Sequence, residues 1–276
     1  EDKDEWYEAK AQQERELEER LASISHKEKE IAESRSALQA KREDLNIEVK
    51  RFKQQENRVQ QREQAARVIV ATTTNERDDT LVDIANSLGV PSFRGSEEDV
   101  LERVVDTANY FGTEVIVEVT GDNPLSDPQI VDEAIKKYRE IKDIDFLSTD
   151  IGWYNSKIDI TFPIGLSAKV FSTALITAVA KRTTLPEDRE HVVNYILRNM
   201  DDFRVVPHHA EGRLKRPELR LTVDYPEDFE LVKHVYEHFF DHTPDFSALD
   251  VIEYLDANPA VRDLNKHCLQ KKYTAS

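Results

Sequence analysis

Residues 115–128 read Val-Ile-Val-Glu-Val-Thr-Gly-Asp-Asn-Pro-Leu-Ser-Asp-Pro. The first five residues form a mainly β-branched apolar run, which is typical of a buried strand. An acidic turn with a fixing proline follows, and a helix is expected near residues 128–139. This stretch therefore predicts a strand, a turn and a helix in immediate succession, which is the repeating unit of α/β sheets.

The same alternation extends to both sides of this stretch. Residues 67–74 form a second β-branched run, and helices are expected at 76–89 and 100–111, each ended by a glycine. Strands are expected at 90–94 and 145–148. The pattern predicts an α/β fold with a doubly wound, mainly parallel sheet. Beyond residue 158 it is less regular, and we expect helices at 169–181, 187–199, 226–240 and 247–257, with strands at 158–162, 203–207 and 219–223.

Residues 1–66 are of a different kind. They contain no Gly and no Pro, and they are rich in good helix formers. They carry 17 acidic and 14 basic residues, a net charge of −3, so most of the total of −17 belongs to residues 67–276. We therefore predict two domains: a long charged helix or coiled coil over 1–66 and an α/β domain over 67–276.

A seven-residue apolar repeat in the first domain supports a coiled coil. Its positions are Leu17, Ile24, Ile31, Leu38, Leu45, Phe52, Val59 and Ala66. The second seam position is weaker, because only Leu21 and Val49 are apolar there. Self-association through residues 17–66, an antiparallel helix pair and a single solvated spacer helix all stay open.

Composition excludes several classes of protein. The acidic excess argues against nucleic-acid binding, and the single cysteine, Cys268, excludes a disulfide scaffold. There is no apolar run of membrane-spanning length and no signal-peptide pattern. These features predict a cytoplasmic protein without nucleic-acid or membrane partners.

Two acidic turns follow strands and could hold a ligand. Asp122 follows the strand at 115–119, and Asp224 follows the strand at 219–223. Ligands of doubly wound sheets lie beyond the carboxyl ends of strands, and Mg²⁺ commonly uses one or two carboxylates together with phosphate oxygens. The alternative is that each Asp only caps the helix that follows it.

Ordered motifs from Val68 to about Lys272 resemble the cytidylyltransferases of the spore-coat polysaccharide type, and more distantly the CMP-sialate and CMP-ketodeoxyoctonate synthetases. The matching stretches are Val68–Asn75, Phe93–Arg103, Val119–Pro128, Arg189-Glu-His191, Leu221–Phe229 and Phe246–Asn265. The resemblance implies a nucleotidyltransferase fold that couples CTP to a sugar or sugar acid, releases pyrophosphate and uses Mg²⁺. It places Asp122 and Asp224 on the metal as catalytic residues. It also implies nucleotide or substrate contacts by Arg94, Ser96, Asp99, Asn123, Arg189, Glu190 and His191.

Two departures from the family pattern bear on activity. Nothing like the family's basic, glycine-containing phosphate loop and first strand precedes Arg67, and the first glycine is Gly89. Residues Ile164, Ser167 and Lys169 stand where the family usually has acids. If the chain is an enzyme, we expect the loop and strand to precede Glu1. The alternative is a catalytically impaired transferase fold that acts as a coiled-coil oligomerisation or interaction module. For the chain as given, the missing loop predicts absent or very low CTP turnover.

Histidines supply a weaker metal candidate. His234, His238 and His242 are spaced i, i+4, i+8, which would place three imidazoles on one helical face, although Pro244 predicts that the helix ends before His242. His208 and His209 are expected to be exposed in a polar loop. Cys268 has no recognisable partner that would activate its thiol.

Overall fold

The computed structural model describes residues 67–155 and 157–270 and, from the preceding segment, only Lys27, Lys29 and Gln39, which are helical and exposed. The chain divides into two units, Glu1–Phe52 and Lys53–Ser276. The heptad positions lie outside the described residues, so the coiled coil, its self-association and the domain boundary at residue 66 stay predictions. Among the described helices, none is long and apolar enough to cross a membrane.

A small parallel sheet opens the described part of the second unit. The sheet consists of two strands with a 3-10 turn and a helix between them, and a longer helix follows: β1 (Val70–Thr73), η1 (Glu76–Asp78), α2 (Asp79–Ser87), β2 (Ser92–Gly95) and α3 (Val100–Phe111). The side chain of Asp99 caps the start of α3, and Gly112 ends the helix with a left-handed φ of 65°. The predicted strand–helix–strand alternation is confirmed here.

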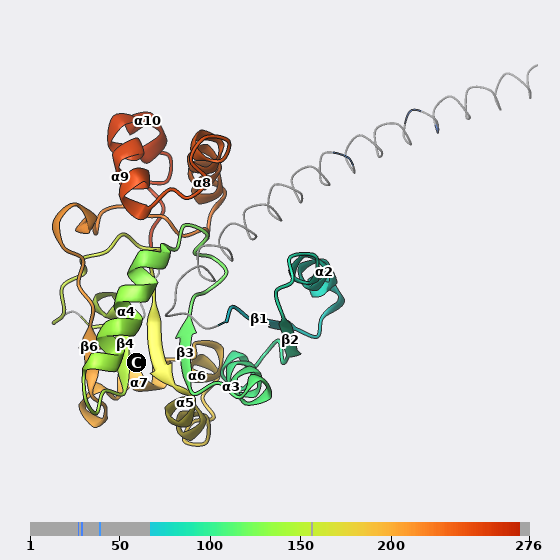
Figure 1. Ribbon diagram of the computed structural model, residues 1–276, viewed down its shortest axis with the longest axis vertical. Helices are drawn as coiled ribbons and strands as arrows, with labels where there is room; N and C mark the ends of the chain where they lie inside the picture. Colours follow the sequence, from blue (N-terminus) through green and yellow to red (C-terminus); the bar gives the residue numbers. More distant parts are fainter. Residues whose placement is uncertain (1–26, 28, 30–38, 40–66, 156, 271–276) are drawn as a thin grey trace, which may run out of the picture. The chain divides into compact units, whose positions relative to one another are not determined.

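The larger sheet has the strand order β3–β5–β4–β6 and mixed directions (Figure 1). Its strands are β3 (Val115–Glu118), β4 (Phe146–Ser148), β5 (Lys169–Ser172) and β6 (Val205–Pro207). β5 runs antiparallel to both β3 and β4, whereas β4 and β6 are parallel. The sheet is therefore mixed: β3, β4 and β6 share one direction, as predicted, and only β5 runs against them.

The physical reason lies in the connection that leads to β5. A parallel neighbour requires a crossover, usually a helix, but residues 149–168 contain only the 3-10 helix η2 (Ile151–Trp153) among their described positions. The chain therefore enters β5 at the end of the sheet at which it left β4, where Ser148 pairs with Lys169. The first residues of the helix predicted at 169–181 form β5 instead, and α5 (Thr173–Ala180) begins only after this strand.

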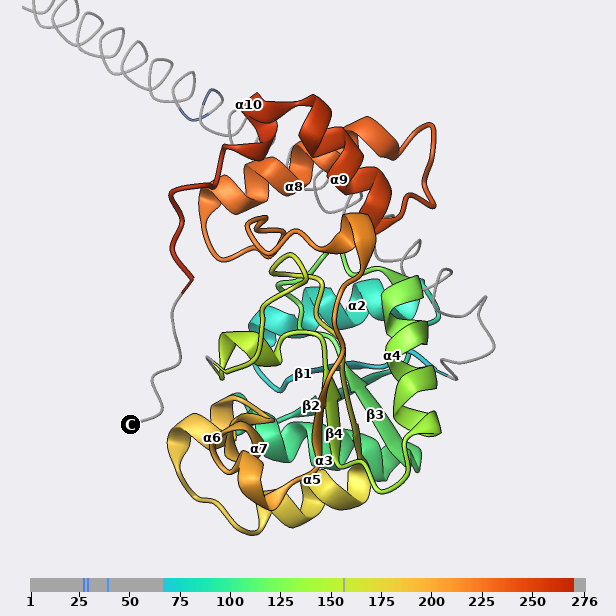
Figure 2. The ribbon, with the colours of Figure 1, turned by 90° about the vertical axis from the view of Figure 1, so that its left-hand side faces the viewer.

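Helices cover both faces of the larger sheet (Figure 2), as the doubly wound prediction requires. α4 (Pro128–Glu140) packs through Ala134 against Leu147 and Val170. The neighbouring strand residues Phe146 and Phe171 point to the other face, where they join a core with side chains of α3, α5 and the short helix α7. The predicted helix at 187–199 is two helices, α6 (Pro186–Glu190) and α7 (Asn194–Arg198).

A third core lies among the C-terminal helices, which are α8 (Pro226–Phe239), α9 (Ala248–Ala257) and α10 (Pro259–Arg262). The segment that leads into α8 was predicted as a strand, but it forms only an isolated bridge between Ile164 and Arg220. Gly165 makes this close approach possible. Its φ is +97°, and a Cβ there would lie 2.4 Å from the Thr222 nitrogen. This bridge positions the turn that carries Asp224.

Candidate active site

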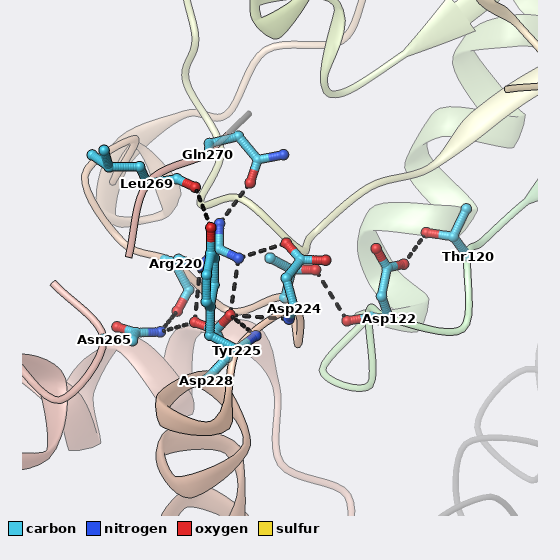
Figure 3. A network of polar contacts seen from close by, with 10 residues as sticks. Thr120, Asp122, Arg220, Asp224, Tyr225, Asp228, Asn265, Leu269 and Gln270 are labelled. Atoms are coloured by element: carbon cyan, nitrogen blue, oxygen red, sulfur yellow. Dashed lines mark hydrogen bonds and ion pairs between the residues drawn. The ribbon is translucent and has the colours of Figure 1, made fainter. Parts of the chain in front are cut away.

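The turns that carry Asp122 and Asp224 lie side by side (Figure 3). The Val223 N–H donates to the Asp122 carbonyl oxygen at 2.8 Å, and the Thr222 hydroxyl donates to the same oxygen at 3.1 Å. Two segments about 100 residues apart in sequence are thus joined directly beside the two carboxylates. The side chain of Asp122 is exposed, and 42% of the Asp224 side chain is exposed.

Arg220 and Asp228 hold the turn that carries Asp224 in place. The Arg220 guanidinium, only 7% exposed, donates to Asp224 at 2.5 Å and to both carboxylate oxygens of Asp228 at 2.8 and 2.9 Å. Asp228 is fully buried and also accepts from the backbone N–H groups of Asp224 and Tyr225. Burial opposes ionisation of Asp228, but Arg220 and these amides hold its pKa below the usual value. The ionised Asp228 therefore positions Asp224.

The Asp122 turn is braced by its own side chains. The Thr120 hydroxyl donates to the Asp122 carboxylate, and the Asn123 amide donates to the Thr120 hydroxyl at 2.9 Å. Asn123, predicted to contact the nucleotide, is buried. In this conformation its amide supports the turn.

A buried ion cluster lies at the sheet ends next to these turns. Lys169, at the start of β5, places its ammonium 3.8 Å from Glu118 and 3.7 Å from Asp150. The Ser167 hydroxyl donates to Asp150 at 2.8 Å. Burial acts to lower the pKa of Lys169, but Asp150 and Glu118 outweigh it and raise the pKa above its usual value. Lys169 is therefore a permanent cation.

This cluster is electrostatically linked to the predicted site residues. Burial raises the pKa of Glu118; Lys169 and His191 lower it, whereas Asp150 and Asp122 add to the rise. His191 and Asp122 thus lie within electrostatic reach of Glu118. Glu118 and Asp150 were not predicted as site residues. The apolar neighbours of Glu118 suggested only a strand, and nothing in the sequence placed either acid beside Lys169.

The residues predicted from the loop after β2 make contacts within the protein. Arg94 donates to the carbonyl oxygens of Thr73 and Asn75 and pairs with Asp79 at 2.6 Å. Ser96 accepts from the Asp99 N–H at 3.0 Å, and Asp99 caps α3. Arg94 therefore ties the end of β1 to α2, whereas Ser96 and Asp99 shape the entry to α3.

Arg189 is distant from Asp99 in the sequence but adjacent to it in space. Its guanidinium contacts Asp99 at 2.5 Å and Glu102 at 2.9 Å. The Asp99 hydrogen bond is the main cause that raises the pKa of Arg189. Glu190 is exposed, and His191 is partly buried. The structure therefore brings Asp122, Asp224 and Asn123 together, pairs Arg189 with Asp99 at the start of α3, and leaves Arg94 in separate contacts with the end of β1 and with α2.

The donor set fits a hard divalent cation. Asp122 and Asp224 offer carboxylates from two adjoining turns, and both side chains reach the surface. Oxygen ligands of this type suit Mg²⁺, which keeps waters and phosphate oxygens in its remaining positions. Arg220 neutralises part of the Asp224 charge, so a polyphosphate that arrives with the cation would not meet an uncompensated acidic surface.

Comparisons with known proteins identify the family of this chain. A family model for cytidylyltransferases matches residues 56–243. An uncharacterised protein of Methanocaldococcus jannaschii is 35% identical over 209 residues, which are 75% of this chain and 79% of that protein. The spore coat polysaccharide biosynthesis protein SpsF of Bacillus subtilis is 32% identical over 197 residues, 70% of this chain and 75% of that protein.

A solved structure extends the likeness to the fold. A cytidylyltransferase from Leptospira borgpetersenii serovar Hardjo-bovis superposes with a TM-score of 0.69 at 29% identity, and the match covers 82% of this chain and 88% of that one. The family model and the curated relatives each span most of the described α/β domain. The chain belongs to the cytidylyltransferase family.

Proposed function

We propose that this chain is a nucleotidyltransferase that couples CTP to a sugar or sugar acid and releases pyrophosphate, with Mg²⁺ held by Asp122 and Asp224. The observation that carries the proposal is the pair of hydrogen bonds from Thr222 and Val223 to the Asp122 carbonyl, because they bring both acidic turns to one place. Family membership supports the use of CTP. The name of the Bacillus subtilis relative supports a role in polysaccharide biosynthesis.

The proposed reaction is an in-line substitution at the α-phosphorus of CTP. A sugar hydroxyl oxygen forms the new bond to the α-phosphorus, and the bond from this phosphorus to the oxygen that bridges the α- and β-phosphates breaks. Pyrophosphate leaves with the electron pair, and the hydroxyl proton passes to solvent water. A bound Mg²⁺ would neutralise phosphate charge as the substitution proceeds. Asp122 and Asp224 would hold the cation, and Arg220 and Asp228 keep Asp224 in position.

The sugar is proposed to lie on the side of Glu118, Lys169 and His191. Lys169 is a permanent cation there, but Glu118 and Asp150 already compensate its charge. We therefore expect this side to recognise hydroxyl groups of the sugar. Asp150 is fixed by Ser167 and cannot turn away without losing a hydrogen bond.

The proposal is tested by measuring pyrophosphate release with CTP, Mg²⁺ and a panel of neutral sugars and sugar acids. We expect Asp122→Asn and Asp224→Asn to lower the rate about a hundredfold or more, since each removes charge from the cation site. Asp241→Asn, at an exposed position outside the site, is the matched control. Because the family's phosphate loop is not recognised in this sequence, we expect slow release and compare it with a blank without protein; no release above this blank would overturn the proposal and favour the alternative of an interaction module.

A further inference from the structure

Glu227, His267 and Cys268 bring three different donor types together outside the candidate active site. One donor atom from each residue lies within 4.8 Å of the others, and Glu227 Oε1 is 3.5 Å from His267 Nε2. Glu227 is in the first turn of α8, whereas His267 and Cys268 belong to the segment that follows α10. Within residues 67–155 and 157–270, no other group of three His, Cys, Asp or Glu side chains approaches this closely.

The segment that carries His267 and Cys268 is held in place by hydrogen bonds to the base of α8 (Figure 3). Buried Asn265 donates to the Arg220 carbonyl at 2.9 Å and to Asp228 at 2.8 Å. Gln270 accepts from Arg220 at 2.5 Å, on the far side of the two donors. The donors are thus presented by a backbone anchored on both sides, which lowers the entropy lost when a ligand binds.

The surroundings favour a cation. Partial burial raises the pKa of the Cys268 thiol, and the charges of Asp228 and Glu227 raise it further. The charge of Arg220 acts in the opposite direction, and a metal ion bound by the sulfur would displace the thiol proton. The negative charges of Asp228 and Glu227 disfavour a thiolate that has no metal beside it, and the same charges attract a divalent ion.

We propose that Glu227, His267 and Cys268 form a Zn²⁺ site that fastens the C-terminal segment to the start of α8. Thiolate sulfur, imidazole nitrogen and carboxylate oxygen are the donors that Zn²⁺ takes in proteins, with water filling a fourth tetrahedral position. A soft thiolate makes this set a poor choice for Mg²⁺, so the site is chemically distinct from the Asp122–Asp224 pair. The side chain of His267 is 68% exposed and that of Glu227 is 44% exposed, so both can rotate to close the remaining distance.

Cobalt substitution tests the proposal directly, because Cys268 is the only cysteine in the 276 residues. The full chain, freed of metal with a chelator and kept under a phosphine reductant, is titrated with Co²⁺ and then with Zn²⁺. We expect a thiolate-to-cobalt charge-transfer band that saturates at one equivalent and disappears as Zn²⁺ displaces the Co²⁺. Cys268→Ser should abolish the band.

Affinity and stability provide the second measurement. His267→Gln and Glu227→Gln should each weaken Zn²⁺ binding about tenfold or more. His234→Gln, an exposed histidine of the same helix, should leave the affinity unchanged. Zn²⁺ should raise the Tm of the unaltered chain but not that of Cys268→Ser. Absence of the charge-transfer band, or unchanged Zn²⁺ affinity in Cys268→Ser, would overturn the site.

Discussion

Glu118 and Lys169 lie directly opposite each other on antiparallel strands β3 and β5, with the Lys169 ammonium 3.8 Å from a buried carboxylate oxygen of Glu118. That oxygen has no hydrogen-bond donor among the described residues. The ammonium of Lys169 is therefore the main compensation for its charge. Asp150, on the other side of Lys169, makes the cluster a buried triad at the strand ends beside Asp122.

Replacing Lys169 should destabilise the protein strongly. In Lys169→Met, two largely buried carboxylates lose their cation, and we expect the free energy of unfolding to fall by about 3–5 kcal/mol at neutral pH. Urea denaturation measures the change. The double variant Glu118→Gln/Lys169→Met should recover part of the loss, because it removes the uncompensated charge. A single variant as stable as the parent would contradict the role of Lys169.

The stability of Lys169→Met should also depend on pH differently from that of the parent. Burial raises the pKa of Glu118, and loss of Lys169 raises it further, so the folded state binds a proton more readily than the unfolded chain. The stability of Lys169→Met relative to the parent should therefore increase as the pH falls from neutral toward the unfolded pKa of a glutamate. Urea midpoints of both proteins across this range check the sign, and a difference between them that does not change with pH would contradict it.

Gly165 should be intolerant of any side chain. Its φ of +97° is strained for other residues, and an added Cβ would meet the Thr222 backbone nitrogen at 2.4 Å. We expect Gly165→Ala to cost about 2–3 kcal/mol or more and to impair pyrophosphate release, because it displaces the segment that carries Asp224. Gly89 also has a positive φ but open space around its Cβ position, so Gly89→Ala should cost only about 1 kcal/mol and spare activity.

Replacing Arg189 should lower the stability of the protein and leave substrate binding nearly unchanged. It joins α3 to α6 through Asp99 and Glu102, and Arg189→Met leaves the partly buried Asp99 without its cation. We expect a loss of about 1–3 kcal/mol with little change in KM. Exposed Arg182 provides the control variant, Arg182→Met. A raised KM with unchanged stability would instead support the substrate contact predicted from the sequence.

His208 should make the fold sensitive to acid. The sequence predicted an exposed loop histidine, but His208 is largely buried against Phe162, and neither ring nitrogen has a hydrogen-bond partner among the described residues. Burial, assisted by Lys137 and His209, lowers the pKa of His208 to about 4, whereas Glu211 acts in the opposite direction. The exposed carboxylate of Glu133 lies 3.8 Å away.

The direction in which pH changes stability follows from the pKa of His208 in the folded and unfolded states. Below a pH of about 6.5 the unfolded chain takes up a proton at His208 that the folded protein refuses, so stability is full above this pH and is lost as the pH falls toward 4. The loss should reach about 2–3 kcal/mol. Thermal unfolding between pH 4 and 7 should show a flatter profile for His208→Phe, whereas His242→Gln, at an exposed position, should behave like the parent.

The neighbourhood of Asp122 could be predicted from the sequence because its information is local. Residues 115–128 specify a strand by their β-branched run, a turn by Gly-Asp-Asn-Pro and a helix start by Asp127-Pro128, and β3 and α4 are found there. The same local logic located α3, α8 and α9. The helix predicted at 169–181 fails at its first residues, because Lys169 and Val170 pair with strands on both sides and sheet pairing outweighs helix propensity.

The sequence by itself determined the family, the α/β character of residues 67–276 and the two acidic turns, since each rests on ordered local motifs. Only the tertiary structure decided that β5 runs antiparallel to its neighbours and that Lys169 compensates Glu118 and Asp150. It also revealed that Glu227 meets His267 and Cys268, some 40 residues away. Local residue preferences act over a few positions, whereas these contacts depend on the direction in which distant segments meet. That direction is set by how the whole core packs.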